Sequence, residues 1–425
     1  MEIKSENEQK SGYEVLAETE ERVILFAAAM DGVEVSETEK SLDELEELLK
    51  TAGAQSVGRL IQSRDRAASD LYLGRGKVEE LRSMIAMYDA TGVVCDDELS
   101  PAQLMNLQDA LEIKVMDRTM VILDIFAAHA GSYEGKLQVE LAQLKFRATR
   151  LVGMRDSLSR LGGGIGTRGP GEKKLETDRR LIRNRISALK QELSQVEKHR
   201  ELIRSRRAVG NLKPAAIVGY TNAGKSTLLN HFTNAGVYEE DQLFATLDPT
   251  TKSLDLSGGQ TILMTDTVGF IRKLPHHLVE AFKSTLEEAK YSDLILHVVD
   301  ASNPQKEKQM EAVYDTLKQL GANESPIITA FNKIDLLNGD EILKDPNAEA
   351  VVRISGKNGE GTDQLLEQIE KILQKQKLYL EKLYGYQEAG KIQLIRSHGQ
   401  LLKEEYRDDG IYVEAYIPKE ILGSI

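Results

Sequence analysis

The sequence predicts an α/β protein in four parts: an amino-terminal α/β domain at 1–132, an antiparallel helical hairpin at 133–208, a second α/β domain at 209–373 and a small carboxy-terminal α/β appendage at 374–425. Three observations predict this organisation. Short apolar runs alternate with helical patterns on both sides of the hairpin, apolar residues recur at steps of three and four within it, and a glycine-rich loop follows an apolar run directly after it.

Composition narrows the class of protein. Of the 425 residues, 41% are apolar and 29% are charged, which excludes a chain that is disordered throughout. The single cysteine, Cys95, forms no intrachain disulfide and no cysteine zinc site by itself, so we expect a reducing compartment. No apolar run approaches the roughly 20 residues of a membrane-spanning helix, and the amino terminus lacks a signal-peptide core. We therefore expect a cytoplasmic protein without a membrane span.

The amino-terminal domain is expected to hold a parallel sheet covered by helices. Its apolar runs lie at 23–28, 92–95 and 113–116, and its helical patterns lie at 41–52, 77–88 and 101–111. Gly74-Arg75-Gly76-Lys77 leads into a helical pattern, so its amides could hold a phosphate or an RNA backbone oxygen. A plain strand-to-helix turn is the favoured interpretation of that stretch.

The hairpin is predicted by two apolar seams with the spacing of a coiled coil. A glycine-rich loop at 162–171 joins them. Residues 133–208 contain 19 Lys and Arg against 9 Asp and Glu, a net charge of +10, so the rest of this −13 chain carries −23. The seams are Leu137, Leu141, Leu144, Ala148 and Leu151, then Ile182, Ile186, Leu189, Leu193 and Val196.

This basic segment is expected to contact RNA. Nine acids cannot neutralise nineteen bases, which disfavours a merely solvated helix face, and a glycine-rich loop leaves its amides free for phosphates. Because no aromatic residue lies near the loop, we expect recognition of the backbone and shape of structured RNA rather than base stacking. The candidate RNA contacts are Arg155, Arg160, Gly163, Gly164, Gly166, Arg168, Gly169, Lys173, Lys174, Arg179 and Arg180.

A phosphate-binding loop is predicted where the second α/β domain begins. An apolar run precedes a G-x-x-x-x-G-K-S pattern and a helical pattern follows, which is the setting that this loop requires. Lys225 is expected to bridge the β- and γ-phosphates, and the Ser226 hydroxyl to ligate Mg²⁺. The loop comprises Gly219, Tyr220, Thr221, Asn222, Ala223, Gly224, Lys225 and Ser226.

A second phosphate motif follows the strand-like run 261–265. Asp266 is expected to hold a Mg²⁺-bound water, and Gly269 to offer its amide to the γ-phosphate. The motif reads Asp266-Thr267-Val268-Gly269, 40 residues beyond Ser226.

A base-recognition motif, Asn332-Lys333-Ile334-Asp335, ends the apolar run 327–331. The Asp335 carboxylate can accept two hydrogen bonds that guanine offers and adenine does not, and an unpaired buried carboxylate discriminates strongly. We therefore expect GTP and GDP as ligands rather than ATP. Ser355-Gly356-Lys357, after the last strand-like run, is expected to contact the guanine oxygen through its backbone.

Together these motifs resemble the ordered set of the translation-factor class of Ras-like P-loop GTPases, over about 213–373. Phe244-Ala245-Thr246-Leu247-Asp248 resembles the switch I motif of the Obg and HflX group, and this resemblance implies that Thr246 completes the Mg²⁺ shell. On chemistry alone, the hydroxyls of Thr250 and Thr251 are equal candidates.

The hairpin indicates the family. The loop 162–171 and the residues 172–180 after it resemble the glycine-rich signature that precedes the GTPase domain of HflX proteins. The resemblance implies a GTPase that binds the 50S ribosomal subunit and its 23S rRNA. It also implies that the protein dissociates stalled or idle 70S ribosomes, notably under heat stress, and hydrolyses GTP with ribosome stimulation. We expect a monomer off the ribosome, partly ribosome-associated or peripherally membrane-associated.

Two positions bear on catalysis. Phe270 occupies the position where Ras-like enzymes keep a water-orienting glutamine, so the catalytic residue stays unknown, and Arg272, Lys273 or ribosomal RNA are the candidates to complete the site. Asn222 matches the asparagine that related potassium-activated GTPases use. Its amide oxygen could bind K⁺ or could satisfy loop amides, and both interpretations stay open.

Other functions are weighed against this one. The chain could be a GTPase of ribosome assembly or tRNA modification, an ATP-dependent ribosomal RNA remodeller that uses the amino-terminal domain, or a binding module with a passive GTPase switch. The carboxy-terminal part carries no evident chemistry. There we expect a helix over 372–383 that continues out of the GTPase domain, an apolar segment at 391–395 and a strand at 411–417.

Overall fold

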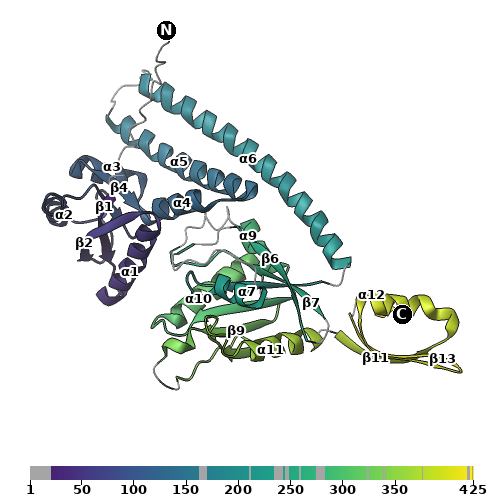
Figure 1. Cartoon of the computed structure of the whole chain (residues 1–425). Helices are drawn as coiled ribbons and strands as arrows, with labels where there is room; N and C mark the ends of the chain where they lie inside the picture. Colours follow the sequence, from purple (N-terminus) through teal and green to yellow (C-terminus); the bar gives the residue numbers. More distant parts are fainter. Residues whose placement is uncertain are drawn as a thin grey trace, which may run out of the picture. The chain divides into compact units, whose positions relative to one another are not determined.

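The computed structural model describes residues 21–161, 170–209, 212–233, 243–244, 248–257, 260–273, 283–322, 325–337, 339, 341–375, 377–418, 422–423 and 425. The chain divides into two compact units. The first consists of 1–96 and 104–116, and the second of 97–103 and 117–425. Figure 1 labels most of their helices and several of their strands.

The first unit is built on a four-stranded sheet with the order β2-β1-β3-β4. Both β2 and β3 pair with β1 in parallel, and residues 23–29 of β1 are all buried, as expected for a strand covered on both faces. The predicted α/β class is confirmed. The strands are β1 (Glu21–Ala29), β2 (Ala54–Ser63), β3 (Gly92–Cys95) and β4 (Lys114–Asp117), and the helices are α1 (Val35–Thr51), α2 (Arg75–Tyr88) and α3 (Pro101–Leu111).

Strand β2 was not predicted from the sequence. It lies at the edge of the sheet, and only Ala54 and Leu60 of its ten residues are buried. An edge strand with few buried residues leaves a weak apolar pattern, so its pairing with β1 supplies what the local sequence does not.

The helical region of the second unit comprises α4 (Arg118–His129), α5 (Tyr133–Leu161) and α6 (Pro170–Val209). The predicted seam is present, because Leu137 and Leu141 of α5 pack against Leu189 of α6. Glu134 pairs with Arg200, and Glu140 pairs with Arg185. Partner numbers fall along α6 as they rise along α5, so the two helices run antiparallel.

The GTPase-like domain of the second unit holds a six-stranded sheet with the order β10-β9-β8-β5-β7-β6. All its neighbours pair in parallel except β6, which is antiparallel to β7. Its strands are β5 (Lys213–Gly219), β6 (Thr250–Asp255), β7 (Thr261–Asp266), β8 (Leu294–Asp300), β9 (Ile327–Asn332) and β10 (Ala350–Arg353), and its helices are α7 (Lys225–Thr233), α9 (Lys283–Lys290), α10 (Lys306–Leu320) and α11 (Thr362–Lys375).

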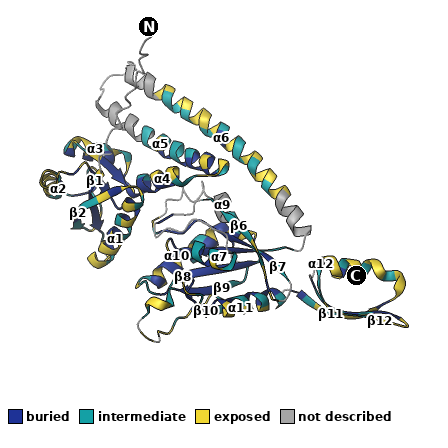
Figure 2. Ribbon diagram, viewed as in Figure 1, coloured by how far each residue is buried: buried dark blue, intermediate teal, exposed yellow. Residues whose placement is uncertain are grey.

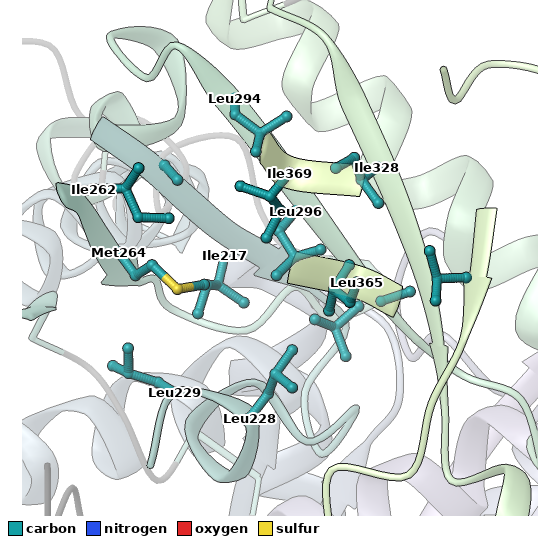
Figure 3. Packing of buried hydrophobic residues seen from close by; sticks show 14 of the residues in the cluster. Ile217, Leu228, Leu229, Ile262, Met264, Leu294, Leu296, Ile328, Leu365 and Ile369 are labelled. Atoms are coloured by element: carbon teal, nitrogen blue, oxygen red, sulfur yellow. The ribbon is translucent and has the colours of Figure 1, made fainter. Parts of the chain in front are cut away.

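The core of this domain fixes the strands that carry the site. Ile217 of β5, Leu228 of α7, Leu296 of β8 and Ile369 of α11 are fully buried in one cluster, and Figure 3 shows these side chains between the strands and helices. Burying a side chain of this size contributes about 1.5–3 kcal/mol. Because β5, β7, β8 and β9 are parallel, their carboxyl ends meet at one edge of the sheet.

The carboxy-terminal appendage corrects one prediction. Helix α11 ends at Lys375, and the residues expected to continue it form β11 (Lys377–Tyr384), which pairs antiparallel with β13 (Gly410–Pro418). Leu378 and Leu380 pack on the cluster of Val413 and Ala415, so long-range sheet pairing outweighs the local helical pattern. Strand β12 (Gln400–Arg407) pairs with the other side of β13, and the apolar segment 391–395 lies in helix α12 (Ala389–His398).

Burial along the chain is shown in Figure 2, where the central strands of the GTPase-like domain are dark blue. Among the described residues, no helix is both long enough and apolar enough to cross a membrane.

Candidate nucleotide-binding site

The phosphate loop connects β5 to α7. Its two glycines have positive φ, 155° at Gly219 and 90° at Gly224. A Cβ at Gly219 would collide with the carbonyl oxygen of Val298, and one at Gly224 would collide with the side-chain amide of Asn332. Only glycine therefore fits at either end of the loop.

Lys225 opens α7 and is 7% exposed. Its ammonium donates to the carbonyl oxygen of Tyr220 at 2.8 Å, which turns the side chain back over the loop. Burial lowers the pKa of Lys225 to about 8, and the Asp266 carboxylate opposes that shift. A phosphate beside this amine would stabilise its charged form.

Ser226 and Asp266 meet where β7 ends. The Ser226 hydroxyl donates to Asp266 Oδ2 at 2.7 Å, and Asp266 is fully buried. A hydroxyl and a carboxylate placed together are the oxygen donors that Mg²⁺ prefers. The donor set therefore fits the metal that the sequence predicts.

The structure describes two of the three threonines that are candidates for the Mg²⁺ shell. Thr250 lies opposite Asp266 in the β6–β7 register, whereas the Thr251 hydroxyl is 2.9 Å from the hydroxyl of Thr265. Thr246, with Ala245 and Leu247, lies outside the described residues, so its role stays a prediction.

Gly269 brings the second phosphate motif against the first. A Cβ there would lie 2.7 Å from Thr221 Cγ2 and 3.0 Å from Lys225 Nζ. Thr267 is held in turn by its hydroxyl, which donates to the carbonyl oxygen of Ile217 at 2.7 Å. Both motifs named as phosphate contacts thus lie together, and the neighbouring Val268 is buried.

The base-recognition motif lies at the end of β9. The Asn332 amide donates to the carbonyl oxygen of Ala223 at 2.9 Å, and its amide oxygen accepts from the N–H of Gly356 at 2.8 Å. Asp335 Oδ1 accepts from the Ser355 hydroxyl at 2.6 Å. The structure therefore brings the predicted base-recognition residues beside the phosphate loop, with Ile334 and Lys357 adjacent in sequence.

One supporting residue was missed by the sequence analysis. Asp300 ends β8, and its carboxylate pairs with Lys333 Nζ at 2.8 Å. It also accepts from the N–H and hydroxyl of Ser302. The sequence contained a pattern that could have indicated Asp300. It is an acid at the carboxyl end of a buried strand, and that position lies on the same sheet edge as Asp266 and Asn332.

Comparison with known proteins assigns the family. Three family models match in succession: GTP-binding GTPase N-terminal at 39–127, GTP-binding GTPase Middle Region at 129–207 and 50S ribosome-binding GTPase at 214–333. GTPase HflX of Lacrimispora saccharolytica is 64% identical over 96% of each chain. This chain belongs to the HflX family of GTPases. GTPase HflX of Escherichia coli is 47% identical over 77% of this chain and 78% of its own.

A solved structure also shows a likeness to this HflX-family chain. A GTP-binding protein from the hyperthermophilic archaeon Sulfolobus solfataricus, in complex with GDP, is 24% identical and covers 83% of this chain and 98% of its own, with a TM-score of 0.44. The family assignment rests on the matches described above, which establish GTP hydrolysis to GDP and phosphate as the activity.

In this HflX-family chain, Phe270 offers no polar group to the reaction. The ring is 3% exposed, and the backbone of Phe270 pairs with the phosphate loop through Gly219 and Thr221. The Tyr220 hydroxyl accepts from the N–H of Arg272 at 2.6 Å, which fixes the next turn of the chain. The buried ring therefore packs within the domain, and the residue that orients the attacking water stays unknown.

The predicted RNA contacts of this HflX-family chain are only partly described. Arg179 and Arg180 lie on α6, half-buried and exposed respectively. Arg155, Arg160, Lys173 and Lys174 lie on the hairpin helices, but their side chains fall outside the described part of the structure. The loop residues Gly163, Gly164, Gly166, Arg168 and Gly169 also lie outside the described residues.

Proposed function

We propose that this HflX-family GTPase binds the 50S ribosomal subunit through its basic hairpin and dissociates stalled or idle 70S ribosomes. One observation carries the proposal. A helical hairpin with a net charge of +10 is joined to a GTP-hydrolysing domain in a chain that is otherwise acidic. Phosphate backbones attract such a segment, while the acidic remainder opposes indiscriminate binding to RNA. The matching family model, described as a 50S ribosome-binding GTPase, supports the same partner.

The hairpin is suited to reach a partner at a distance. Its helices span 29 and 40 residues, and at about 1.5 Å per residue the longer one extends roughly 60 Å. The seam of Leu137, Leu141 and Leu189 stiffens it near its base. We assign 23S rRNA as the contact of the far end, where the basic residues and glycines concentrate.

The proposed cycle begins with GTP. The γ-phosphate orders switch I (244–248) and switch II (266–273), the GTPase domain and hairpin then bind the 50S subunit, and their placement excludes the 30S subunit. Hydrolysis releases the factor. In the cell this places the chain in the cytoplasm, partly on ribosomes.

Mg²⁺ is the proposed cofactor. Ser226 would ligate it directly and Asp266 through a water, with Thr246 as the third residue that the family resemblance indicates. When bound, Mg²⁺ neutralises charge on the β- and γ-phosphate oxygens. Lys225 holds the same oxygens from the loop, and the neighbouring amides orient the phosphates.

We also propose K⁺ as a second ion, held by Asn222. This residue is exposed on the phosphate loop and has a positive φ of 58°, a backbone conformation that asparagine tolerates better than most residues. GTP hydrolysis measured in KCl and in NaCl at equal ionic strength tests the proposal. Faster hydrolysis in KCl is expected, and equal rates would exclude a potassium role.

The attacking water must be oriented by a group outside the Phe270 side chain. A buried phenyl ring neither donates nor accepts the required hydrogen bond. We therefore propose slow hydrolysis by the free protein and stimulation by ribosomes, with Arg272, Lys273 or ribosomal RNA completing the site.

Sucrose-gradient sedimentation of 70S ribosomes tests the proposed function. With the protein and either GTP or a non-hydrolysable analogue, the 70S peak is expected to fall while the 50S and 30S peaks rise. Unchanged 70S peaks with both nucleotides would reject dissociation. Binding to 50S subunits without dissociation would instead favour a role in ribosome assembly.

A matched pair of charge reversals tests the hairpin. Arg180→Glu on α6 is expected to weaken 50S binding and to reduce the salt dependence of binding by about one charge. Lys318→Glu on α10 makes the same change of charge at another exposed site and should leave 50S binding intact. Equal losses from both variants would mean that net charge, rather than the hairpin, governs binding.

A further inference from the structure

Switch I is attached to the beginning of α5. Asp248 Oδ2 accepts from the backbone N–H groups of Gly131 and Ser132, at 2.9 and 2.6 Å. The Ser132 hydroxyl donates to the other carboxylate oxygen. These donors lie at a helix amino terminus, where a negative charge is stabilised by unsatisfied N–H groups and the helix dipole.

Gly135 makes room for this carboxylate. It lies in the first turn of α5, and a Cβ there would come within 2.5 Å of Asp248 Oδ1. The same residue donates its N–H to the Ser132 hydroxyl oxygen at 2.8 Å, which caps the helix. A glycine inside a helix is unfavourable relative to alanine, so its presence here has a steric reason.

The other end of switch I rests on α4. The Phe244 ring packs edge-on against Phe126, with 4.7 Å between ring centroids and 79° between planes, and both side chains are buried. Phe244 also has a positive φ of 59°. A bulky residue keeps that conformation only where its surroundings hold it.

We propose that Gly135, Ser132 and Phe126 are positioning residues for switch I, acting through Asp248 and Phe244. Holding both ends of the five-residue segment reduces the conformational freedom that it loses when it engages the γ-phosphate. The helical region therefore strengthens binding of GTP over GDP, because only GTP carries the phosphate that switch I contacts. This inference rests on the assignment of 244–248 as switch I.

The same attachment should couple GTP binding to RNA binding by the hairpin. Helix α5 is the first helix of the basic hairpin, so a partner that moves this helix also moves the anchor of Asp248. If hairpin position alters GTP affinity, GTP must alter the affinity of the hairpin for its partner by the same factor. The anchor thus supplies a physical route between the RNA-binding segment and the nucleotide site.

Gly135→Ala in the full chain is the sharpest test. The added methyl group displaces the Asp248 carboxylate while improving the helix propensity of α5. We expect the affinity for a non-hydrolysable GTP analogue, measured by calorimetry with Mg²⁺, to fall about ten-fold, with GDP affinity no lower than in the parent chain. Unchanged or increased analogue affinity would overturn the proposal.

Gly390→Ala is the matched control. Gly390 lies in α12, and no atom of the described part of the chain lies within 4 Å of an added Cβ, so we expect the substitution to change mainly the helix propensity. It should leave both nucleotide affinities unchanged. A loss of analogue affinity in this variant equal to that of Gly135→Ala would also overturn the proposal.

A second pair of variants tests the contact between Ser132 and Asp248 while keeping the helix cap. Ser132→Asp retains a capping oxygen but faces Asp248 with a like charge, so the preference for the GTP analogue over GDP should fall. Adding Asp248→Asn supplies an amide donor to the new carboxylate and should restore part of that preference. A fall without restoration would indicate a general disturbance of α5 and contradict the specific contact.

Thr246→Ala separates failure of the inference from failure of its premise. If this variant keeps the full preference for GTP analogue over GDP, the switch I assignment is wrong. If it loses the preference while Gly135→Ala keeps it, switch I is correctly assigned and the positioning role of α5 is rejected.

Discussion

The side-chain amide of Asn332 donates to the carbonyl oxygen of Ala223 across 2.9 Å, so the base-recognition motif directly supports the phosphate loop. The same side chain accepts from the N–H of Gly356 at 2.8 Å. Asn332 is 3% exposed, and its two hydrogen bonds join the end of β9 to the phosphate loop and to the residues after β10. We therefore propose that phosphate binding and base recognition are coupled through Asn332.

Asn332→Ala should weaken GTP and GDP binding together. Loss of both hydrogen bonds leaves a buried carbonyl and N–H without these partners, at a cost of about 1–3 kcal/mol each, so we expect affinities at least about ten-fold lower. Titration calorimetry measures both nucleotides. Asn303→Ala, in the loop after β8, removes an amide that accepts from the local N–H of Gln305 and should leave both affinities intact.

Asp335→Asn should change the preferred base. Guanine offers two N–H donors to the carboxylate, whereas an amide presents one acceptor and one donor. Xanthine carries an oxygen where guanine carries its amino group and so suits the amide. We expect GTP affinity to fall about 10²-fold or more and XTP affinity to rise. Asp315→Asn on the exposed face of α10 is the control, and a similar loss of GTP affinity there would refute base recognition by Asp335.

Local motifs indicated the proposed nucleotide site, whereas the elements around it were predicted less completely. The phosphate loop and Asp266 could be assigned because each follows a buried parallel strand, and parallel strands place their carboxyl ends together. The missed Asp300 follows the same rule but belongs to no short motif. Strand β11 was predicted as helix because its pattern is locally ambiguous, and only pairing with β13 decides it. The contact between Asp248 and Ser132 joins residues 116 positions apart, which no local pattern reveals.

Lys225→Met should stabilise the nucleotide-free protein while abolishing GTP binding. The folded-state pKa of Lys225 is about 8, below its ordinary 10.5, so the fold disfavours the protonated side chain. This penalty is fully present below pH 8 and disappears as the pH rises from 8 to 10.5. A shift of this size corresponds to about 3 kcal/mol. Urea unfolding at pH 7 should therefore show a more stable variant, with a smaller gain at pH 9.5.

The pH dependence is the discriminating part of that experiment. If methionine stabilises simply by better packing, the gain will be the same at both values of pH. A constant difference would therefore contradict the assigned cause, whereas a shrinking one shows that burial of the charged ammonium lowers the stability of the fold.

Arg150→Met should destabilise the second unit strongly. Arg150 pairs with Asp117 at 2.7 Å, and the Asp117 side chain is completely buried. Asp117 also caps α4 by accepting from the N–H of Met120. Burial raises the pKa of Asp117 and Arg150 opposes that shift, so removing the guanidinium leaves a buried carboxylate without its counter-ion. We expect the free energy of unfolding at pH 7 to fall by about 3 kcal/mol or more.

Arg185→Met provides the contrast for this ion pair. Arg185 also pairs with a carboxylate at 2.7 Å, that of Glu140, but both side chains are at least 40% exposed. Solvent screens such pairs, so the expected loss is about 1 kcal/mol or less. The loss of unfolding free energy in Arg150→Met should also become smaller as the pH falls, because protonation removes the charge of Asp117. Equal deficits in the two variants at pH 7 would mean that burial of Asp117 does not determine the strength of this pair.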